Sequence, residues 1–335
     1  MRLLVLGGGG FLGFHMVAEA LAAGHEVTVF GRSAKAPLDG VEVLTGDRQG
    51  DLTALRGQTW DAVLDTFTDT APGAPAVRAT AELLSGSVGG YGYVSGMSVY
   101  APSGPSRPDE SGPVRQAGVE PDDDPLQERS LAKLAAEAVL AEVFDGPVLL
   151  PRVGIMVGPR DPSHRFTWWP LRFHRALTGA APRVVPAPGD PGRPVQYSDA
   201  RDIAGWVVGM LAAGRGGVFN TVGPGREEPL AAVLAACLTA AREAAGGGSA
   251  GDVELDWTGE DELRERLAGV EEEQRPLWFP EDQIPQAAID SAAVVAAGLR
   301  FRTALDTARD TLRWALDTGA DGLVDGPFEH RMNPA

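Results

Sequence analysis

The stretch Leu6-Gly7-Gly8-Gly9-Gly10-Phe11-Leu12-Gly13 decides the fold of this 335-residue chain. It follows the apolar run 3–6, which is typical of a strand that is buried on both faces. It leads into residues 11–23, whose apolar positions have helical spacing and which Gly24 ends as a C-cap would. Residues 27–30 read as a second strand. This order predicts a βαβ unit of the size that binds nucleotides.

The same alternation continues along the chain, and it favours an α/β fold with a doubly wound parallel (Rossmann) sheet. Further strands are expected at 41–44, 61–65, 91–95, 148–150 and 218–222, and helices at 75–84, 126–143, 203–213, 286–297 and 303–316. The pattern changes after about residue 160, where aromatic residues and a Pro/Gly stretch at 182–194 appear. We therefore expect a nucleotide-binding domain over 1–160, to which 195–223 returns. A smaller, mixed substrate lobe would comprise mainly 161–194 and 224–335.

Composition excludes several classes of protein. The 29 cationic and 46 acidic side chains give a net charge of −17, which argues against a nucleic-acid surface because phosphate binding needs clustered cations. A single cysteine, Cys237, excludes an intrachain disulfide and a multi-cysteine zinc site. We find no metal-ligand spacing, no apolar segment that could span a membrane, and no signal peptide. The expectation is a cytoplasmic monomer or homodimer that binds neither membrane nor nucleic acid.

The glycine turn carries the pattern Gly-x-x-Gly-x-x-Gly at Gly7, Gly10 and Gly13. Glycine allows a sharp turn and a close approach of the backbone to a pyrophosphate. The following helix then offers free N–H groups and the positive end of its dipole. A flexible linker is the alternative interpretation, but a linker would not stand between a buried strand and an amphipathic helix.

The end of the second strand bears on the choice of cofactor. It reads Phe30-Gly31-Arg32-Ser33 and lacks the acid that an NAD-preferring site uses for the ribose hydroxyls. Arg32 and Ser33 suit a 2′-phosphate, because a guanidinium makes strong charge-assisted bonds to phosphate. We therefore expect NADP(H) to be preferred, with NAD(H) possible. The alternative is that Arg32 is a solvated loop residue.

Five motifs together resemble those of the extended short-chain dehydrogenase/reductases, which include NAD(P)-dependent sugar epimerases and dehydratases. The resemblance covers nearly the whole chain. It rests on the glycine turn and on Gly46-Asp47-Arg48, Val94-Ser95-Gly96-Met97-Ser98-Val99-Tyr100, residues 150–155 and residues 196–202. The resemblance implies that Asp47 and Arg48 bind the adenine end, that Lys133 holds the nicotinamide ribose, and that residues 150–155 lie beside the nicotinamide. The cofactor-binding residues that we expect are Gly7, Gly9, Gly10, Phe11, Leu12, Gly13, Arg32, Ser33, Asp47, Arg48, Thr66, Phe67, Lys133, Val153 and Ile155.

The catalytic positions depart from this family's pattern. The family uses a Tyr-x-x-x-Lys pair and a Ser or Thr, and here Lys133 is present while Arg129 stands at the tyrosine position and Gly96 at the hydroxyl position. Ser95 and Ser98 are the nearest alternative hydroxyls. Arg129 cannot be the acid, because a guanidinium does not deprotonate in proteins. It either stabilises a developing alkoxide or is a solvated surface residue, and these five residues are the catalytic candidates.

A large, flat substrate would suit the aromatic residues of the smaller lobe, since aromatic walls stack on aromatic ligands. The candidates are Tyr100 of the nucleotide-binding domain and, in the smaller lobe, His164, Phe166, Trp168, Trp169, Phe173, Leu277, Trp278 and Phe279. The alternative for each aromatic residue is that it belongs to the core of the lobe. Residues 101–125, rich in Pro, Gly, Ser and Asp, would form a long loop that closes over the site as a lid.

Within the family, an intact cofactor turn with lost tyrosine and serine resembles the atypical reductases of actinobacterial antibiotic pathways. This resemblance implies an NADPH-dependent ketoreductase that acts on an aromatic polyketide of angucyclinone type. Hydride transfer would proceed without the usual Ser/Tyr relay, and the proton would come from a substrate phenol or from water. A non-catalytic NADP-binding regulator and a nucleotide-sugar epimerase or dehydratase are the alternatives.

Overall fold

A computed structural model describes most of the chain as two compact units. The described residues are 1–68, 74–102, 104, 107–119, 126–224, 228–246, 252–271, 274–278, 280, 288–320 and 324–332. Unit 1 comprises Met1–Gly154, Ala200–Val222 and Ala288–Arg300, and unit 2 comprises Ile155–Asp199, Gly223–Ala287 and Phe301–Ala335. Parts of the expected 101–125 loop, and Phe279, lie outside the described residues.

Unit 1 is built on a central parallel sheet, as the sequence predicted. The strands are β1 (Arg2–Leu6), β2 (Glu26–Gly31), β3 (Glu42–Thr45), β4 (Ala62–Asp65), β5 (Tyr91–Tyr93), β7 (Val148–Val153) and β12 (Gly217–Thr221). They lie in the order β3-β2-β1-β4-β5-β7-β12, and the short β6 (Ser95–Gly96) also pairs with β7. Leu3 to Leu6 of β1 are fully buried, which explains the continuous apolar run.

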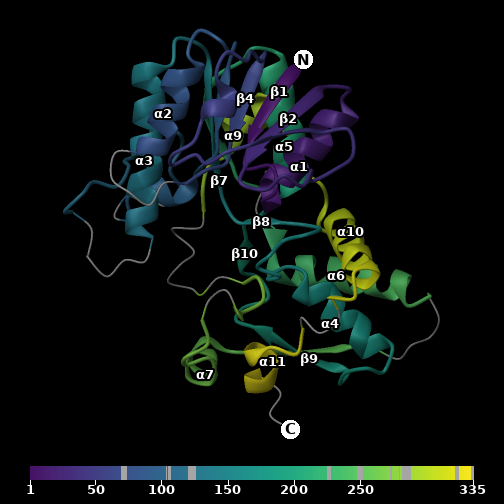
Figure 1. Cartoon of the computed structure of the whole chain (residues 1–335). Coiled ribbons are helices and arrows are strands. Elements are labelled where there is room, and N and C mark those ends of the chain that lie inside the picture. Colours follow the sequence, from purple (N-terminus) through teal and green to yellow (C-terminus); the bar gives the residue numbers. More distant parts are fainter. Residues whose placement is uncertain are drawn as a thin grey trace. The chain divides into compact units, whose positions relative to one another are not determined.

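Helices cover both faces of this sheet (Figure 1). The helices α2 (Pro75–Leu84) and α3 (Gln127–Val143) lie together on one face, and α1 (Phe11–Ala22) and α5 (Ala200–Ala212) on the other. Pro75 occupies the first turn of α2, where its missing N–H leaves no helical bond unmade. This arrangement confirms the doubly wound fold.

The direction of winding reverses between β1 and β4. The chain runs outward from β1 to β2 and β3, then crosses back to β4 on the other side of β1. At this reversal Leu6 pairs with Phe30 on one side and with Asp65 on the other, so the carboxyl ends of three strands meet there. In open α/β sheets, ligands bind outside the carboxyl ends at such a switch point.

Unit 2 is smaller and mixed in structure. Its strand pairs are β8 (Met156–Val157) with β11 (Ser198–Asp199), β9 (Val184–Pro188) with β14 (Glu254–Thr258), and β10 (Pro194–Val195) with β13 (Glu228–Pro229). Its helices are α4 (Trp168–Leu177), α6 (Leu230–Ala244), α7 (Glu260–Arg266), α10 (Ala304–Asp317) and α11 (Pro327–Met332). The strand β9 lies in the Pro/Gly stretch 182–194, where the sequence pattern gave no strand.

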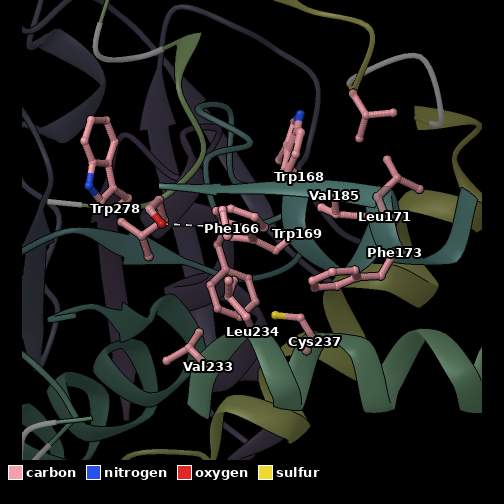
Figure 2. Packing of buried hydrophobic residues seen from close by; sticks show 14 of the residues in the cluster. Phe166, Trp168, Trp169, Leu171, Phe173, Val185, Val233, Leu234, Cys237 and Trp278 are labelled. Carbon is pink, nitrogen blue, oxygen red and sulfur yellow. Dashed lines mark hydrogen bonds between the residues drawn. The ribbon is translucent and has the colours of Figure 1, made fainter. Parts of the chain in front are cut away.

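The core of unit 2 is rich in aromatic side chains (Figure 2). Val233, Leu234 and Cys237 of α6 form one side of this core, and the rings of Trp168 and Trp278 lie on the opposite side of the cluster that Figure 2 draws. The helices α4, α6 and α10 pack against one another around it.

One segment differs from the expected division of the chain. The helix α9 (Ala292–Ala296) is shorter than the 286–297 pattern indicated and belongs to unit 1 rather than to the substrate lobe. It is held by the Trp206 indole, which donates to the Ala297 carbonyl at 3.3 Å, and by Asn220 Nδ2, which donates to the Asp290 carbonyl at 3.0 Å. Within the described residues, no helix has the length and apolar character to cross a membrane.

Candidate active site

The glycine turn follows β1, and three of its glycines are required by the fold itself. Gly7 has φ +93°, and a Cβ there would lie 2.3 Å from Thr66 Oγ1. A Cβ on Gly13 would lie 2.3 Å from the Gly7 carbonyl oxygen, and one on Gly8 would lie 2.7 Å from Val29. A side chain at any of these positions would collide with the protein's own strand or helix, so these glycines allow α1 to pack close to β1 and β2.

Gly9 and Gly10 are different, because both are exposed and a side chain there would not collide with the protein. A Cβ on Gly9 would meet nothing within 4 Å, and one on Gly10 would lie 3.5 Å from the Gly7 carbonyl. Gly10 is the N-cap of the 12-residue α1 and supplies no side-chain cap to its first N–H groups. The open backbone and uncapped helix start fit a pyrophosphate, which such N–H groups bind. Phe11 is half-buried at the helix start, and Leu12 is buried behind it.

The side chains at the ends of β2 and β3 are solvent-exposed. Arg32 and Ser33 directly follow β2, and the Ser33 hydroxyl accepts the backbone N–H of Lys35 at 3.1 Å. Asp47 follows β3 and accepts the N–H of Gln49 at 3.0 Å. Because these side chains are exposed, a ligand could reach them. Arg32 and Ser33 can therefore still bind a 2′-phosphate, and Asp47 can still bind an adenine, as expected from the sequence.

Arg48 differs from the role expected at the adenine end, because its guanidinium is buried in an ion pair. Its Nη1 and Nη2 donate to the two carboxylate oxygens of Asp65 at 2.7 and 2.8 Å, and its Nε donates to Thr80 Oγ1 at 2.9 Å. Asp65 is fully buried at the end of β4, where it also accepts the Tyr91 hydroxyl at 2.6 Å. A buried carboxylate needs such partners, since an unpaired buried charge is very costly.

The residues that follow Asp65 are tied to the same strand end. Thr66 Oγ1 donates to the Leu6 carbonyl at 3.0 Å and occupies the space where a Gly7 side chain would lie. The N–H of Phe67 donates to Asp65 Oδ1 at 2.9 Å. The centroid of the Phe67 ring lies 5.0 Å from Arg48 Cζ, so the guanidinium stacks over this ring. The ion pair thus holds the segment that borders the glycine turn. The sequence analysis did not identify Asp65 as a residue of this site. The only sequence signal was an acidic residue at the end of an apolar strand.

Lys133 and Gly96 are brought together, as the family's pattern implies for these positions. Lys133 of α3 is 5% exposed, and its Nζ donates to the Val94 carbonyl at 2.8 Å. A Cβ on Gly96 would lie 3.6 Å from Lys133 Cδ and 3.7 Å from its Cε, which is ordinary van der Waals contact. Burial and the positive charge of Arg129 lower the pKa of Lys133 to about 8.

The other catalytic candidates do not gather around this lysine. Arg129 is exposed at the start of α3, which favours the solvated surface residue over the alkoxide-binding group. Ser95 is fully buried, but neighbouring residues of a strand face opposite sides of the sheet, so its side chain lies on the face away from Lys133. Ser98 is half-buried, and its backbone carbonyl accepts Arg115 Nε at 2.7 Å.

Tyr100 takes part in a buried network rather than lining an open wall. Its hydroxyl donates to Asn220 Oδ1 at 2.6 Å and accepts Arg152 Nη1 at 3.1 Å, while Arg152 also pairs with Glu137 at 2.7 Å. Burial raises the pKa of Tyr100. The hydroxyl is therefore held by the fold of unit 1.

The described part of the expected lid is attached to unit 1. The N–H of Asn220 donates to Glu110 Oε1 at 2.8 Å, and Tyr100 forms an isolated bridge with Val114. The N–H of Arg115 also donates to the Val99 carbonyl at 2.8 Å. Residues 107–119 are thus anchored, and the function of a lid stays a prediction.

The two residues expected beside the nicotinamide fall on either side of the boundary between the units. Val153 is buried in β7 of unit 1, where it pairs with Gly96 and with Thr221. Ile155 is the first residue of unit 2, is half-buried, and packs against that unit's core.

Most of the aromatic substrate candidates form the core of unit 2. Phe166, Trp169 and Phe173 are fully buried, and the Trp169 indole donates to the Leu277 carbonyl at 3.0 Å. This burial favours the core alternative for these three. Trp168 and Trp278 are also buried, but among the described residues their indole N–H groups have no hydrogen-bond partner.

His164 combines two unusual features. Its φ is +56°, a conformation that non-glycine residues rarely adopt, and its ring stacks on Trp314 with the centroids 6.2 Å apart. Burial lowers the pKa of His164, so the ring is neutral near pH 7. Strained residues of this kind concentrate at functional sites, which keeps His164 a candidate.

Unit 2 also contains an open hollow of about 510 Å³ that the sequence did not indicate. Gly189, Asp190, Gly192, Arg193, Pro194, Gly259 and Glu260 line it. The buried Arg193 guanidinium forms an ion pair with Glu260 at its wall. The two halves of the lining come from distant segments, since Arg193 and Glu260 are 67 positions apart in the sequence. Local sequence patterns could not predict that these segments meet.

Comparison with known proteins shows the fold. No family model and no curated protein sequence matches the chain. Solved structures resemble it along almost its whole length. One is TunA, an NAD-dependent NDP-hexosamine 5,6-dehydratase involved in tunicamycin biosynthesis, with a TM-score of 0.63 at 17% identity over 94% of this chain and 98% of that one.

Two further neighbours agree with this likeness. The UDP-Glc/GlcNAc 4-epimerase from Campylobacter jejuni has a TM-score of 0.62 at 14% identity, covering 94% of this chain and 99% of that one. Bordetella bronchiseptica WbmH in complex with NAD⁺ has 0.61 at 16%, covering 95% and 99%. At these identities the likeness concerns the fold alone, and the chain shares the Rossmann fold of these neighbours.

Proposed function

We propose that the protein is an oxidoreductase that uses a nicotinamide cofactor, preferably NADPH, to reduce a ketone. One observation carries this proposal. Unit 1 keeps an open glycine turn and a buried lysine at the strand ends, while the acid–base positions hold Gly96 and the exposed Arg129. Hydride transfer mainly needs two reactants held close and aligned, and it tolerates this loss better than other chemistry does.

The residues present fit a dinucleotide. The backbone of Gly9 and Gly10 and the start of α1 would hold the pyrophosphate, Arg32 and Ser33 the 2′-phosphate, Asp47 the adenine, and Lys133 the nicotinamide ribose. When bound in its reduced form, the cofactor would supply the hydride. The role of the protein is then to orient the carbonyl and to control where its proton comes from.

Reduction is favoured over epimerisation or dehydration. Those reactions require a side chain that removes a hydroxyl or C–H proton, which is general-base work for a tyrosine. The structure offers no tyrosine at position 129 and no hydroxyl at position 96, and Tyr100 is engaged with Asn220 and Arg152. A ketone that is already polarised would not need the missing groups.

An aromatic polyketide ketone of angucyclinone type is the proposed substrate. The chain resembles the atypical ketoreductases of antibiotic pathways, and the ketoreductase that acts on the angucyclinone of simocyclinone is one such enzyme. A phenol beside the carbonyl would polarise it through an internal hydrogen bond, and the phenol or water could supply the proton. The unpartnered indole N–H groups of Trp168 and Trp278 support a flat acceptor that carries oxygen atoms.

A nucleotide sugar is the second candidate substrate. It is favoured by the fold neighbours, among them a 5,6-dehydratase of NDP-hexosamines and an epimerase of UDP-Glc and UDP-GlcNAc. The hollow in unit 2, with Arg193 at its wall, has room for a polar ligand.

The decisive experiment compares substrates by NADPH absorbance. We expect the purified protein to oxidise NADPH with an angucyclinone ketone and not with UDP-glucose or UDP-GlcNAc. Conversion of the UDP-sugar alone would support the second candidate. Tight NADPH binding with no turnover of either would favour a non-catalytic regulator and overturn the proposal.

Cofactor choice has its own test at Arg32. Replacing Arg32 by Ala removes a charge-assisted bond to the 2′-phosphate, and such bonds contribute about 1.5–3 kcal/mol, or roughly a 10- to 100-fold change in affinity. We expect fluorescence titration to show weaker NADPH binding and unchanged NADH binding. An equal effect on both cofactors would contradict the NADPH assignment. Arg56→Ala, at a second exposed arginine, is the control for net charge.

A further inference from the structure

The Lys133 side chain lies against Gly96, the residue that stands where the family's pattern has a hydroxyl. It lies at the carboxyl ends of the sheet, where its stem passes Gly96 and its ammonium donates to the Val94 carbonyl at 2.8 Å. An ammonium has three N–H donors, and this bond uses one of them. The ring of Tyr93 lies 5.6 Å from Nζ and holds the charge by a cation–π contact.

The position next to this lysine carries no side chain, although a small one would fit there in ordinary contact. A serine at position 96 would place its Cβ 3.6 Å from Lys133 Cδ without a clash, yet the residue is glycine. The tyrosine position, one helical turn before Lys133, holds an arginine that is exposed. A substrate oxygen at this point would therefore meet the lysine rather than a hydroxyl.

The charges around Lys133 act on its pKa in both directions. Three charged side chains act on it, namely Arg129 on its own helix, Glu137 on its own helix and Asp65 on β4. Asp65 and Glu137 raise the pKa of Lys133, but each acts less than Arg129 does, and each is paired with an arginine, Glu137 with Arg152 and Asp65 with Arg48. Arg129 adds a positive charge that opposes the ammonium.

Burial adds to this effect. Removing an ammonium from water disfavours its charged form, and Lys133 is 5% exposed. Burial, together with Arg129, lowers its pKa to about 8. A general acid works best when its pKa lies near the operating pH, so this lysine is suited to give up a proton.

We propose that the Lys133 ammonium is the general acid of the reduction, in place of the missing tyrosine. As the carbonyl carbon gains a hydride from the reduced nicotinamide, the Nζ–H bond breaks and its proton passes to the carbonyl oxygen, giving the alcohol. Nζ becomes a neutral amine and regains a proton from water. The inference rests on the proposed function, and it assigns to the protein a proton that would otherwise come from a substrate phenol or from water.

Two variants separate proton donation from binding. Lys133→Arg keeps the positive charge that would hold a ribose, but a guanidinium does not release a proton. Lys133→Met keeps an apolar stem and removes the charge. With an angucyclinone ketone, we expect Lys133→Arg to bind NADPH within about threefold of the wild type, and to lose turnover by roughly 100-fold, the lower range of general acid catalysis.

The wild-type rate should also depend on pH in one direction. Because the charged form is the acid, turnover should be constant below the pKa of Lys133 and fall about tenfold per pH unit above it, near pH 8. This fall should be absent from the residual turnover of Lys133→Arg. A structural role of Lys133 would not produce such a profile.

A measurement without turnover completes the test. The chain has only two lysines, Lys35 and Lys133, so lysine labelled with ¹³C at Cε gives two NMR signals, which a Lys35→Arg variant assigns. We expect the Lys133 signal to titrate near pH 8. The inference is overturned if that signal shows a charged amine up to pH 10, or if Lys133→Arg keeps full turnover. If the wild type turns over no ketone at all, the proposed function fails as well.

Discussion

The glycine turn after β1 and the glycine at the end of β6 look alike in sequence, but their constraints differ. At Gly7 and Gly13 an added Cβ would lie 2.3 Å from protein atoms, and at Gly13 the nearest is a backbone oxygen that cannot move aside. At Gly96 the same Cβ would lie 3.6 Å from the nearest atom. The fold thus requires the first two glycines, whereas it would accept a side chain at position 96. The missing hydroxyl there is a matter of chemistry and not of packing.

The largest expected effect concerns the ion pair that supports the turn. Asp65→Asn leaves the Arg48 guanidinium buried beside a neutral amide, and breaking a buried pair in this way costs about 3–5 kcal/mol. We expect urea unfolding to show a loss of this size. The double variant Arg48→Met/Asp65→Leu is the control, since it removes both charges and should lose less than the single variant. An unchanged midpoint for Asp65→Asn would show that the pair does not support the turn.

The next effect concerns two glycines of the turn, Gly13, which the packing of the fold requires, and Gly9, which it does not. Gly13→Ala should lower stability by about 1–3 kcal/mol, because the methyl group collides with the Gly7 carbonyl. Gly9→Ala should change stability by less than about 0.5 kcal/mol and still weaken NADPH binding, since its side chain would stand where the ligand approaches. Thermal unfolding and NADPH titration measure the two properties. If Gly9→Ala binds NADPH like the wild type, the turn does not hold the cofactor.

The smallest effect on stability is expected at position 96. Gly96→Ser should shift the free energy of unfolding by less than about 1 kcal/mol, because the added Cβ would make only ordinary van der Waals contacts. The matched control is Gly92→Ser on β5, whose Cβ would lie 3.2 Å from Leu211 and which should lose about 1–3 kcal/mol. Equal losses of stability for the two variants would show that position 96 is as tightly packed as position 92.

The same position allows the chemistry to be rebuilt. Gly96→Ser/Arg129→Tyr would restore the hydroxyl and tyrosine that the family's pattern contains, and general acid catalysis contributes about 100-fold or more. Because we propose that Lys133 already supplies the proton, we expect the double variant to stay folded, to bind NADPH and to reduce the ketone within about threefold of the wild-type rate. An increase of tenfold or more would show that the wild type lacks an efficient acid, and would contradict the role proposed for Lys133.

Sequence patterns predicted unit 1 well and unit 2 poorly, for a physical reason. The strands of unit 1 are buried on both faces, so each is a continuous apolar run such as Leu3 to Leu6 that a local reading detects. The strand β9 reads Val-Val-Pro-Ala-Pro and pairs with β14, whose sequence lies about 70 positions later. Its prolines argue locally against a strand, and only the distant partner makes it one.

The site divides in the same way. The sequence located the glycine turn after the first strand, Arg32 after the second strand, and the departures from the family's tyrosine and serine positions. It assigned Arg48 to the adenine end, because nothing near Arg48 in sequence shows that Asp65 is buried beside it. It also could not rank the aromatic candidates, since full burial of Phe166 and Phe173 depends on α6 and on other segments of unit 2.

The sequence by itself determined what depends on neighbouring residues. Strand, turn and helix follow from local apolar spacing and from the freedom of glycine, and the missing catalytic pair is evident from counting residues. Only the tertiary structure decided which charges are free. It paired Arg48 with Asp65 and Glu137 with Arg152, left Arg129 in solvent, and placed Lys133 beside Gly96. Burial and electrostatic pairing depend on residues that are distant in the chain, so the chemistry of Lys133 arises from the fold and not from its motif.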